Sequence, residues 1–329
     1  MKASVGILAA AYCLPAARRT AQEIFRDEGV NLGPGLEARL GIAEVPVCNG
    51  ETASNLAVEA AREALRRAGV DPMQVDVVVE YSVLPQEYLV PVWNMSNKVQ
   101  AEVGASKSFV VGFSGGGATN FLVALSSAVA MLQENENLKT ALLVTGDVAI
   151  PGNRVLNPSD PVTVLGDSAS AVVLQRGTTS AVMDTDLWSD GTNHDICYIP
   201  GGSLIHPDDA ELYRLQLDKQ RYDAFPKTDI VRDMSTTLLK RAGIHWDDLA
   251  CVIYPNISSE DQNQLQQVFN GKMAPACAFN RTTHGHLQGT DFVLNYLSVL
   301  EKRELRPGDY MLAVSHGMGA LAGVSLIRC

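Results

Sequence analysis

The chain repeats one helix–glycine–strand unit at long range. Residues 65–70 read Leu-Arg-Arg-Ala-Gly-Val before the apolar run 75–79, and residues 239–244 read Leu-Lys-Arg-Ala-Gly-Ile before the run 249–253. The two copies are offset by 174 residues without a gap. In each copy the glycine suits the left-handed conformation that ends a helix, and the apolar run is typical of a buried strand. A unit repeated in this way predicts a duplicated α/β fold.

A second pair of segments repeats in the same order. Residues 119–121 open a predicted helix that is followed by a strand, and residues 290–292 open another at an offset of 171 residues. Two matches in one order and at nearly one offset support each other. The chain of 329 residues is therefore predicted to form two similar halves, 1–175 and 176–329.

The repeat also predicts where a site would form. If the halves pack about a pseudo-twofold axis, the predicted helices 119–133 and 290–302 become neighbours at the centre, and both carry apolar faces suited to burial. The loops that enter them, 112–118 and 284–289, then face each other. Helix N-termini offer free N–H groups and favour negative charge. The sequence therefore predicts an oxyanion-stabilising site between the two loops.

Charge and composition narrow the function classes. A net charge of −11, from 37 acidic and 26 basic residues, argues against a nucleic-acid binder, which needs a basic surface. No apolar run reaches the ~18 residues of a membrane span, and the apolar segment 3–17 is predicted to be a first strand rather than a secretion signal. Six cysteines without a CxxC pair predict reduced thiols in a cytoplasmic protein and no metal site.

The first of the two loops contains a G-x-S-x-G pattern. Residues 112–116 hold Ser114 at the centre, after a predicted strand and before a predicted helix, which is the context of a nucleophile elbow. A glycine-rich turn without a catalytic role accounts for the same residues. A phosphate loop is disfavoured because no Gly-Lys-Ser/Thr follows.

The second loop places a histidine near an acidic residue. His286 precedes Asp291, which lies near the start of the predicted helix and can either cap it or turn back to orient the imidazole as a general base. Further on, His316 lies at the end of a buried strand, where its side chain is expected only to pack. The backbone N–H groups of Met318 and Gly319 are predicted to complete an oxyanion hole.

Several segments together resemble a known family. In chain order they are Arg-Leu-Gly-Ile at 39–42, Glu-Thr at 51–52, Gly-Asp-Val at 146–148, Leu-Gly-Asp-Ser-Ala-Ser-Ala at 165–171 and Gly-Met-Gly at 317–319. Over essentially its full length the chain resembles the β-ketoacyl-acyl-carrier-protein synthase III branch of the thiolase superfamily. The resemblance implies a duplicated, thiolase-like five-layer αβαβα fold and a homodimer.

The nucleophile position departs from the family pattern. Counted without a gap, the catalytic cysteine of these synthases falls on Ala118, or on Gly117 after a slip of one residue, and neither can be acylated. Ser114 is the nearest nucleophile, about one helical turn away, and some relatives use serine instead of cysteine. An engineered replacement at Ala118 is a further alternative. The sequence leaves these cases open.

The other two family positions also differ. The family's Pro-His segment resembles residues 255–256, and its Gly-Asn segment resembles residues 285–286, so histidine and asparagine are exchanged. The pairing of His286 with Asp291 looks like the divergent secondary-metabolite branch, which transfers acyl groups to small acceptors. Three residues are predicted to bind substrate: Asn256, Arg39 and His194.

The sequence as a whole predicts an acyltransferase of the ketosynthase III-like type (EC 2.3.1.-). It would move an acyl group from a CoA or acyl-carrier-protein thioester to a small acceptor, forming a C–C, C–O or C–N bond in polyketide or other specialised metabolism, without a cofactor. The acyl carbonyl would lie near Ala118 and Met318, and His286, oriented by Asp291, would activate the nucleophile and the acceptor.

Two features of this prediction stay open. The acidic net charge would repel an acidic carrier protein, so that docking needs a local basic patch involving Arg39, or else the donor is a CoA ester. Two other functions also remain as alternatives: a catalytically degenerate partner subunit, suggested by the missing cysteine, and a serine hydrolase built on Ser114.

Overall fold

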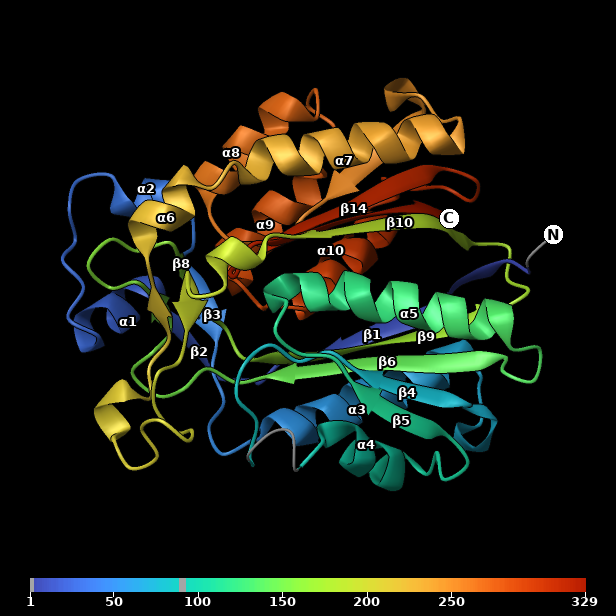
Figure 1. Cartoon of the computed structure of the whole chain (residues 1–329), viewed down its shortest axis with the longest axis horizontal. Helices are drawn as coiled ribbons and strands as arrows, with labels where there is room; N and C mark the ends of the chain where they lie inside the picture. Colours follow the sequence, from blue (N-terminus) through green and yellow to red (C-terminus); the bar gives the residue numbers. More distant parts are fainter. Residues whose placement is uncertain (1–2, 89–92) are drawn as a thin grey trace.

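Two β-sheets alternate with three layers of helices in the computed structural model, which describes residues 3–88 and 93–329 (Figure 1). The first sheet has the strand order β1 (Val5–Cys13), β9 (Ser168–Arg176), β6 (Thr140–Asp147), β4 (Val77–Glu80), β5 (Phe109–Gly112). The second sheet has the order β10 (Ala181–Ser189), β15 (Leu321–Arg328), β14 (Tyr310–Gly317), β13 (Leu249–Ile253).

Helices fill the space between the sheets and cover their outer faces (Figure 1). The central layer is α5 (Asn120–Glu134) and α10 (Thr290–Glu301). The outer face of the first sheet carries α3 (Ala53–Ala68) and α4 (Met95–Val103), and that of the second carries α7 (Lys227–Ala242) and α8 (Ser259–Val268). The five-layer αβαβα arrangement that the sequence predicted is confirmed.

The remaining elements are short and lie mostly around the loops. They are β2 (Arg18–Thr20), α1 (Ala21–Asp27), α2 (Leu36–Leu40), β3 (Glu44–Pro46), η1 (Pro72–Gln74), η2 (Gly117–Thr119), β7 (Val155–Leu156), β8 (Thr163–Val164), η3 (Gly191–Asn193), β11 (Cys197–Tyr198), η4 (Ala210–Leu212), β12 (Gln216–Leu217), α6 (Lys219–Ala224), η5 (Trp246–Asp248) and α9 (Pro275–His284).

The two sheets repeat one pairing pattern. In the series β1-β9-β6-β4 the neighbours pair antiparallel, antiparallel and then parallel, and the series β10-β15-β14-β13 pairs in the same way. Strand β5 is the additional member of the first sheet. This pattern agrees with the internal repeat, and we retain the division into halves 1–175 and 176–329 as a proposal.

Two helices end at the glycines where the sequence predicted helix ends. Helix α3 is capped by the Thr52 hydroxyl, which accepts from the Asn55 N–H, and it ends at Gly69 with φ 64°. Helix α7 ends at Gly243 with φ 71°. A different requirement holds for Gly146 on β6, because a Cβ there would lie 2.3 Å from the Ala53 carbonyl oxygen. The start of α3 therefore packs against bare sheet backbone.

The N-terminal ends of the two central helices meet in the core. The rings of Phe121 and Phe292 stack with centroids 5.0 Å apart and an interplanar angle of 16°. Tyr81 packs edge-on against Phe121, with centroids 5.5 Å apart. All three rings are buried. This contact brings the loops that precede α5 and α10 to one place between the sheets.

Three chemical features of the chain complete the picture. All six cysteines are unpaired. Within residues 3–88 and 93–329, none of the helices is both long and apolar enough to cross a bilayer. The same residues contain no group of three or more histidine, cysteine or acidic side chains placed to hold a metal ion.

Truncation of the central ring stack is expected to destabilise the whole fold. Phe292→Ala removes a fully buried ring between the sheets and leaves a cavity, which typically costs about 3–5 kcal/mol of unfolding free energy. Denaturant unfolding followed by circular dichroism measures the change. Phe279→Ala is the control, because that ring is 57% exposed and its loss should cost less than about 1 kcal/mol. Equal losses in the two variants would contradict the prediction.

Candidate active site

A cavity of about 570 Å³ lies where the loops before α5 and α10 meet the end of β14. Segment 82–88 forms one wall, and residues of segment 197–202 with Tyr213 and Leu215 form another. The lining residues from the two loops and the end of β14 are Ser114, Gly117, Ala118, His286, Gln288, His316, Gly317 and Met318. The cavity therefore joins both predicted loops to the strand end that was predicted to supply an oxyanion hole.

His286 and Asp291 form a buried pair beside this cavity. The His286 Nδ1 atom lies 2.6 Å from Asp291 Oδ2, and both side chains are buried. The Asp291 carboxylate also accepts from the Leu287 N–H at 2.9 Å and from Asn256 through its backbone N–H at 2.8 Å and its Nδ2 at 3.1 Å. These donors fix the carboxylate. Because a carboxylate is an acceptor, the arrangement assigns the imidazole proton to Nδ1 and leaves Nε2 with a lone pair.

The backbone around His286 holds the ring in place. The His286 N–H donates to the Val164 carbonyl at 3.0 Å, and the Gly166 N–H donates to the His286 carbonyl at 3.1 Å. The preceding Gly285 has φ 64°, and a Cβ at that position would lie 2.7 Å from the Val164 carbonyl oxygen. Only glycine fits there, so the Gly-His dipeptide is required by the close approach of these two segments.

Asn256 has a different place from the one predicted. Its Nδ2 donates to Asp291, its Oδ1 accepts from Asn295 Nδ2 at 3.0 Å, and it is not among the residues that line the cavity. Both ends of the amide are therefore occupied by the interior. The structure makes Asn256 a support for Asp291 and corrects its prediction as a substrate-binding residue.

Ala118 lies at the entrance to the first central helix. It is part of η2, lines the cavity and is buried. A Cβ on the neighbouring Gly117 would lie 3.4 Å from the Met318 nitrogen, so the two predicted oxyanion-hole segments are in close contact. Within the described residues no backbone acceptor for the Met318 N–H is found. Gly319, the other predicted member, is not among the lining residues.

Ser114 lines the same cavity on an exposed loop. No hydrogen bond joins its hydroxyl to a histidine in the described part of the chain. Strand β5 ends at Gly112 and η2 begins only at Gly117, so Ser114 does not sit on a tight strand–helix turn. The geometry of a nucleophile elbow, which the G-x-S-x-G pattern suggested, is not formed.

Arg39 and His194 lie outside this cavity. Arg39 lines a second cavity of about 520 Å³, where it pairs with Asp160 at 2.7 Å and lies 3.7 Å from Glu260. Its charge is thus balanced by carboxylates, and the predicted basic patch around it is not formed. His194 follows η3 and is exposed to solvent. Neither residue lines the main cavity, and their predicted role in substrate binding stays a prediction.

Two cavity residues were missed by the sequence analysis. Cys197 belongs to the lining, but burial raises the pKa of its thiol to about 12, which makes it a poor nucleophile. Glu80 is also buried in the wall, where burial raises the pKa of its carboxyl and the Ser82 N–H donates to it at 2.6 Å. Neither carries a sequence signal, because the cavity is assembled from segments far apart in the chain.

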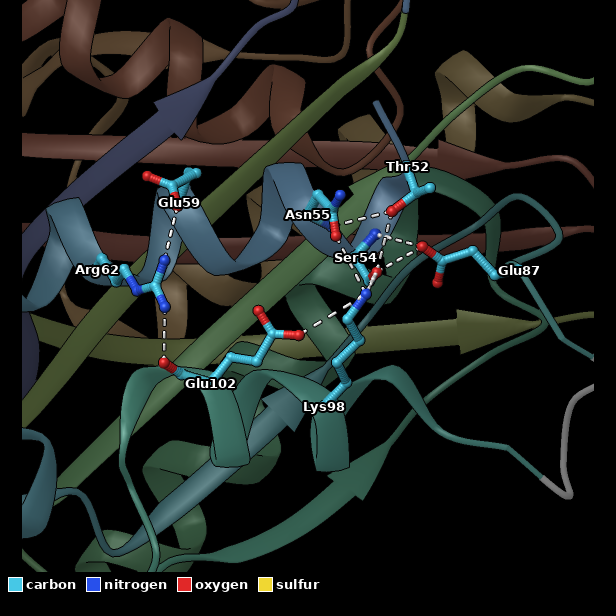
Figure 2. Close-up of polar contacts among 8 residues, drawn as sticks. All are labelled: Thr52, Ser54, Asn55, Glu59, Arg62, Glu87, Lys98 and Glu102. Atoms are coloured by element: carbon cyan, nitrogen blue, oxygen red, sulfur yellow. Dashed lines mark hydrogen bonds and ion pairs between the residues drawn. The ribbon is translucent and has the colours of Figure 1, made fainter. Parts of the chain in front are cut away.

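The wall formed by residues 82–88 is anchored at both ends. Asp147 Oδ1 accepts from the N–H groups of Val83 and Leu84, each at 2.7 Å. At the other end Glu87 accepts from the Ser54 hydroxyl at 2.5 Å, and Lys98 Nζ lies 2.6 Å from the same hydroxyl (Figure 2). Figure 2 shows Glu87 reaching the start of α3, opposite Lys98 of α4. The wall is therefore held by strand β6 at one end and by the outer helices α3 and α4 at the other.

Comparison with known proteins places this geometry in a family. The family model for 3-oxoacyl-[acyl-carrier-protein (ACP)] synthase III matches residues 116–191. A β-ketoacyl-[acyl-carrier-protein] synthase III from Roseobacter denitrificans is 32% identical over 311 residues, which cover 92% of this chain and 90% of the relative. The chain belongs to the β-ketoacyl-[acyl-carrier-protein] synthase III family.

Other comparisons agree with this assignment. The synthase III from Roseiflexus castenholzii is 28% identical over 317 residues, covering 89% of this chain and 88% of the relative. The solved priming β-ketosynthase of the R1128 polyketide biosynthetic pathway shares the fold, with a TM-score of 0.84, 19% identity and coverage of 99% of this chain and 97% of that one. This synthase III family member has the thiolase fold, with Ala118 at the position where the resemblance places the family's cysteine.

The anchor at Asp147 is expected to give this family member a pH-dependent stability. Burial raises the pKa of Asp147 to about 6, compared with about 3.9 for an unfolded aspartate. Folding therefore favours the protonated carboxyl, and the stabilisation is fully present below about pH 4 and is lost as the pH rises through about 6. Asp147→Asn should gain thermal stability relative to the wild type between about pH 4 and 7.

The melting temperatures of both proteins across this range test the prediction. Asp195→Asn provides a control of opposite sign, because a hydrogen bond from Arg221 lowers the pKa of Asp195. Its stability relative to the wild type should fall slightly over the same range. If the difference in melting temperature between Asp147→Asn and the wild type stays constant with pH, the predicted effect of the raised Asp147 pKa is wrong.

Proposed function

We propose that this chain is an acyltransferase in which His286, oriented by Asp291, is the general base. The observation that carries the proposal is the 2.6 Å contact between His286 Nδ1 and Asp291 Oδ2, next to a cavity of about 570 Å³ that also contains Ala118. A buried histidine–carboxylate pair with fixed tautomer suits the removal of a proton from a hydroxyl, amine or activated carbon. The substrates proposed are a thioester donor and a small acceptor.

The transfer can be written without a covalent enzyme intermediate. His286 Nε2 takes the proton from the acceptor as the acceptor atom forms a bond to the thioester carbonyl carbon. The oxyanion accepts from the Met318 N–H and from N–H groups at the start of η2, where a helix leaves them unpaired. Collapse of the tetrahedral intermediate breaks the carbon–sulfur bond, and the departing thiolate receives the proton from His286. The products are the acylated acceptor and the free thiol.

We propose a CoA thioester as the donor, because it requires no docking surface for a carrier protein. An acidic carrier protein would meet a chain of net charge −11 whose Arg39 is already paired with carboxylates. The fold likeness to the R1128 priming ketosynthase supports a place in polyketide or other specialised metabolism. The acceptor would then form a C–C, C–O or C–N bond with the acyl group.

Loss of either member of the pair should abolish most of the activity. His286→Ala and Asp291→Asn are expected to lower kcat by about 10²- to 10⁴-fold, because the base or its correct tautomer is removed. Release of CoA from an acyl-CoA panel, measured with the preferred acceptor, gives kcat. His284→Ala is the control, because that side chain bonds to Thr283 and to the Asn280 carbonyl outside the cavity lining. A control that loses as much activity would argue against the proposed base.

Intact-protein mass spectrometry with the same acyl-CoA panel distinguishes direct transfer from a covalent route. Turnover without an adduct supports direct transfer. An adduct that maps to Ser114 and disappears in Ser114→Ala would show that transfer proceeds through a hydroxyl nucleophile instead of directly. An adduct only in Ala118→Cys would show that the cavity still presents acyl groups at position 118. Neither turnover nor an adduct in any variant would sink the acyltransferase proposal.

One observation favours a second function. Ala118 stands at the nucleophile position, which fits a subunit that shapes an active partner rather than one that is acylated. Such a subunit would be inactive alone and would co-purify with a cysteine-bearing relative. An active, stable assembly of this chain by itself excludes that function.

We further propose that two copies pair through β5. Among the described residues this strand pairs only with β4, and Phe109 on it is 64% exposed. The N–H groups of Phe109 and Phe113 point to β4, where they donate to the Asp76 and Glu80 carbonyls. Because successive N–H groups alternate, that of Val110 faces the open edge. An isologous pairing of these edges would extend the sheet across a twofold axis.

Proline at position 110 should therefore break the dimer without breaking the sheet. Val110→Pro removes an outward N–H but none of the bonds to β4. Light scattering after size exclusion should show twice 35.3 kDa for the wild type and 35.3 kDa for the variant. Leu204→Ser, at a side chain that is 97% exposed in another loop, should stay dimeric. A wild-type monomer would contradict the pairing.

A further inference from the structure

The main cavity is acidic in its ionisable side chains. The described residues that line it include two carboxylates, Glu80 and Glu87, and no lysine or arginine. Its two histidines are in contact with Asp291 and with the Tyr254 hydroxyl. A carboxylate or phosphate placed in this space would find no ammonium or guanidinium group among these residues to neutralise it. The lining therefore favours a neutral or positively charged ligand.

Glu80 is a buried carboxylate without a cation beside it. It is the last residue of β4 and is 6% exposed. Its Oε1 accepts from the Ser82 N–H at 2.6 Å and from Gln86 Nε2 at 2.8 Å, and no ion pair to Glu80 is found within the described residues. Buried carboxylates are normally paired or fully hydrogen-bonded, because the removal of a charge from water is costly. Only one of the two Glu80 oxygens meets this requirement.

The second oxygen of Glu80 is open to the cavity. Within the described residues Oε2 accepts no hydrogen bond, and the buried side-chain atoms that lack a partner do not include it. It is therefore in contact with solvent, and Glu80 is one of the residues that line the main cavity. A Cβ on Gly112 would lie 2.9 Å from Oε2, so that a glycine at the end of β5 leaves space beside this oxygen. A donor on a ligand can occupy that position.

The other carboxylates of this wall already have partners. Glu87 accepts from the Ser54 hydroxyl, which lies 2.6 Å from Lys98 Nζ, so a positive charge stands close to that carboxylate (Figure 2). Both oxygens of Asp147 accept hydrogen bonds from the chain. In this part of the described structure Glu80 is thus the buried carboxylate that has neither a cation nor a full set of donors.

Aromatic rings in the same lining also suit a cation. Tyr88, Tyr198 and Tyr213 line the cavity, and the first two are 66% and 49% exposed. The face of a tyrosine ring attracts an ammonium group. Burial raises the pKa of Glu80, and a bound cation would act in the opposite direction, because a nearby positive charge favours the carboxylate. A cationic ligand would therefore supply what this carboxyl lacks.

We propose that the small acceptor carries an ammonium group in addition to the atom that is acylated, and that Glu80 Oε2 accepts a hydrogen bond from this ammonium. The inference rests on the proposed acyl transfer and names its acceptor class, which comprises amino alcohols, diamines and amino sugars. Glu80 is a binding residue that sets specificity, and His286 takes the proton from the acceptor atom that is acylated. The same lining disfavours an acceptor that carries a carboxylate.

Three ligand series that differ only in one end group test the charge preference. They are straight-chain amino alcohols of four to six carbons, and the diols and hydroxy acids of the same lengths. Ligand-observed NMR titration at neutral pH gives each Kd. The wild type should bind the best amino alcohol about 10- to 100-fold more tightly than the matching diol, the range expected for a hydrogen bond to a charged group. The hydroxy acid should bind more weakly than the diol.

Two variants with the same loss of charge locate the preference. Glu80→Gln keeps the size of the side chain and an oxygen that can accept from Ser82 and Gln86, and it should reduce the preference for the amino alcohol to less than about threefold while diol binding stays within about twofold. Glu59→Gln is the control, because Glu59 pairs with Arg62 on α3, outside the cavity lining (Figure 2). It should keep the wild-type preference. Melting temperatures within a few degrees of the wild type show that both variants are folded.

The outcomes separate this inference from the acyltransferase proposal. A wild type without a preference for the amino alcohol, or a preference that persists in Glu80→Gln, would overturn the ammonium site. Release of CoA from the acyl-CoA panel with the same acceptors is a second, independent readout. Transfer to diols and hydroxy acids as fast as to amino alcohols would overturn the acceptor class and leave the acyltransferase intact. Glu80-dependent binding without any transfer would support the ammonium site and contradict the acyltransferase.

Discussion

The architecture of the site depends on one buried carboxylate. Asp291 lies in the first turn of the central helix α10. Its carboxylate accepts hydrogen bonds from His286 and Leu287 in the preceding loop. It also accepts from Asn256, in the segment after β13. A buried carboxylate without such donors would be strongly unfavourable. The need to satisfy it fixes how three segments meet, and it fixes the tautomer of His286. The orientation of His286, the proposed base, is thus a consequence of the same contacts that complete the core.

The exchange of histidine and asparagine has a structural meaning. Asn256 is held by Asp291 and Asn295 and serves the interior, while His286 faces the cavity. The polar functions are therefore redistributed rather than simply swapped. His316, on strand β14, is the other histidine among the lining residues and differs from His286 in its hydrogen-bond partner. One histidine pairs with a carboxylate, which suits the proposed proton transfer, and the other pairs with the hydroxyl of Tyr254.

The absence of a thiol at position 118 does not leave the cavity chemically empty. The residues that line the cavity still include Ala118 of η2, Met318 and two histidines. Arg39 is neutralised by Asp160 and Glu260, which removes the positive charge that an acidic partner would seek. These features favour a small thioester donor and an acceptor activated by a base over an acyl-enzyme docked to a carrier.

The sequence by itself determined the duplicated α/β fold and the pairing of His286 with Asp291. Both follow from local signals: glycine helix ends, apolar periodicity and a histidine a few residues before a helix-starting aspartate. Only the tertiary structure decided which polar groups face the cavity. Asn256 turns inward, Arg39 and His194 lie outside the main cavity, and His316 contacts Tyr254 in the interior. The physical reason is that buried polar groups choose partners from segments distant in the chain, and the residue pattern of one segment does not encode that choice.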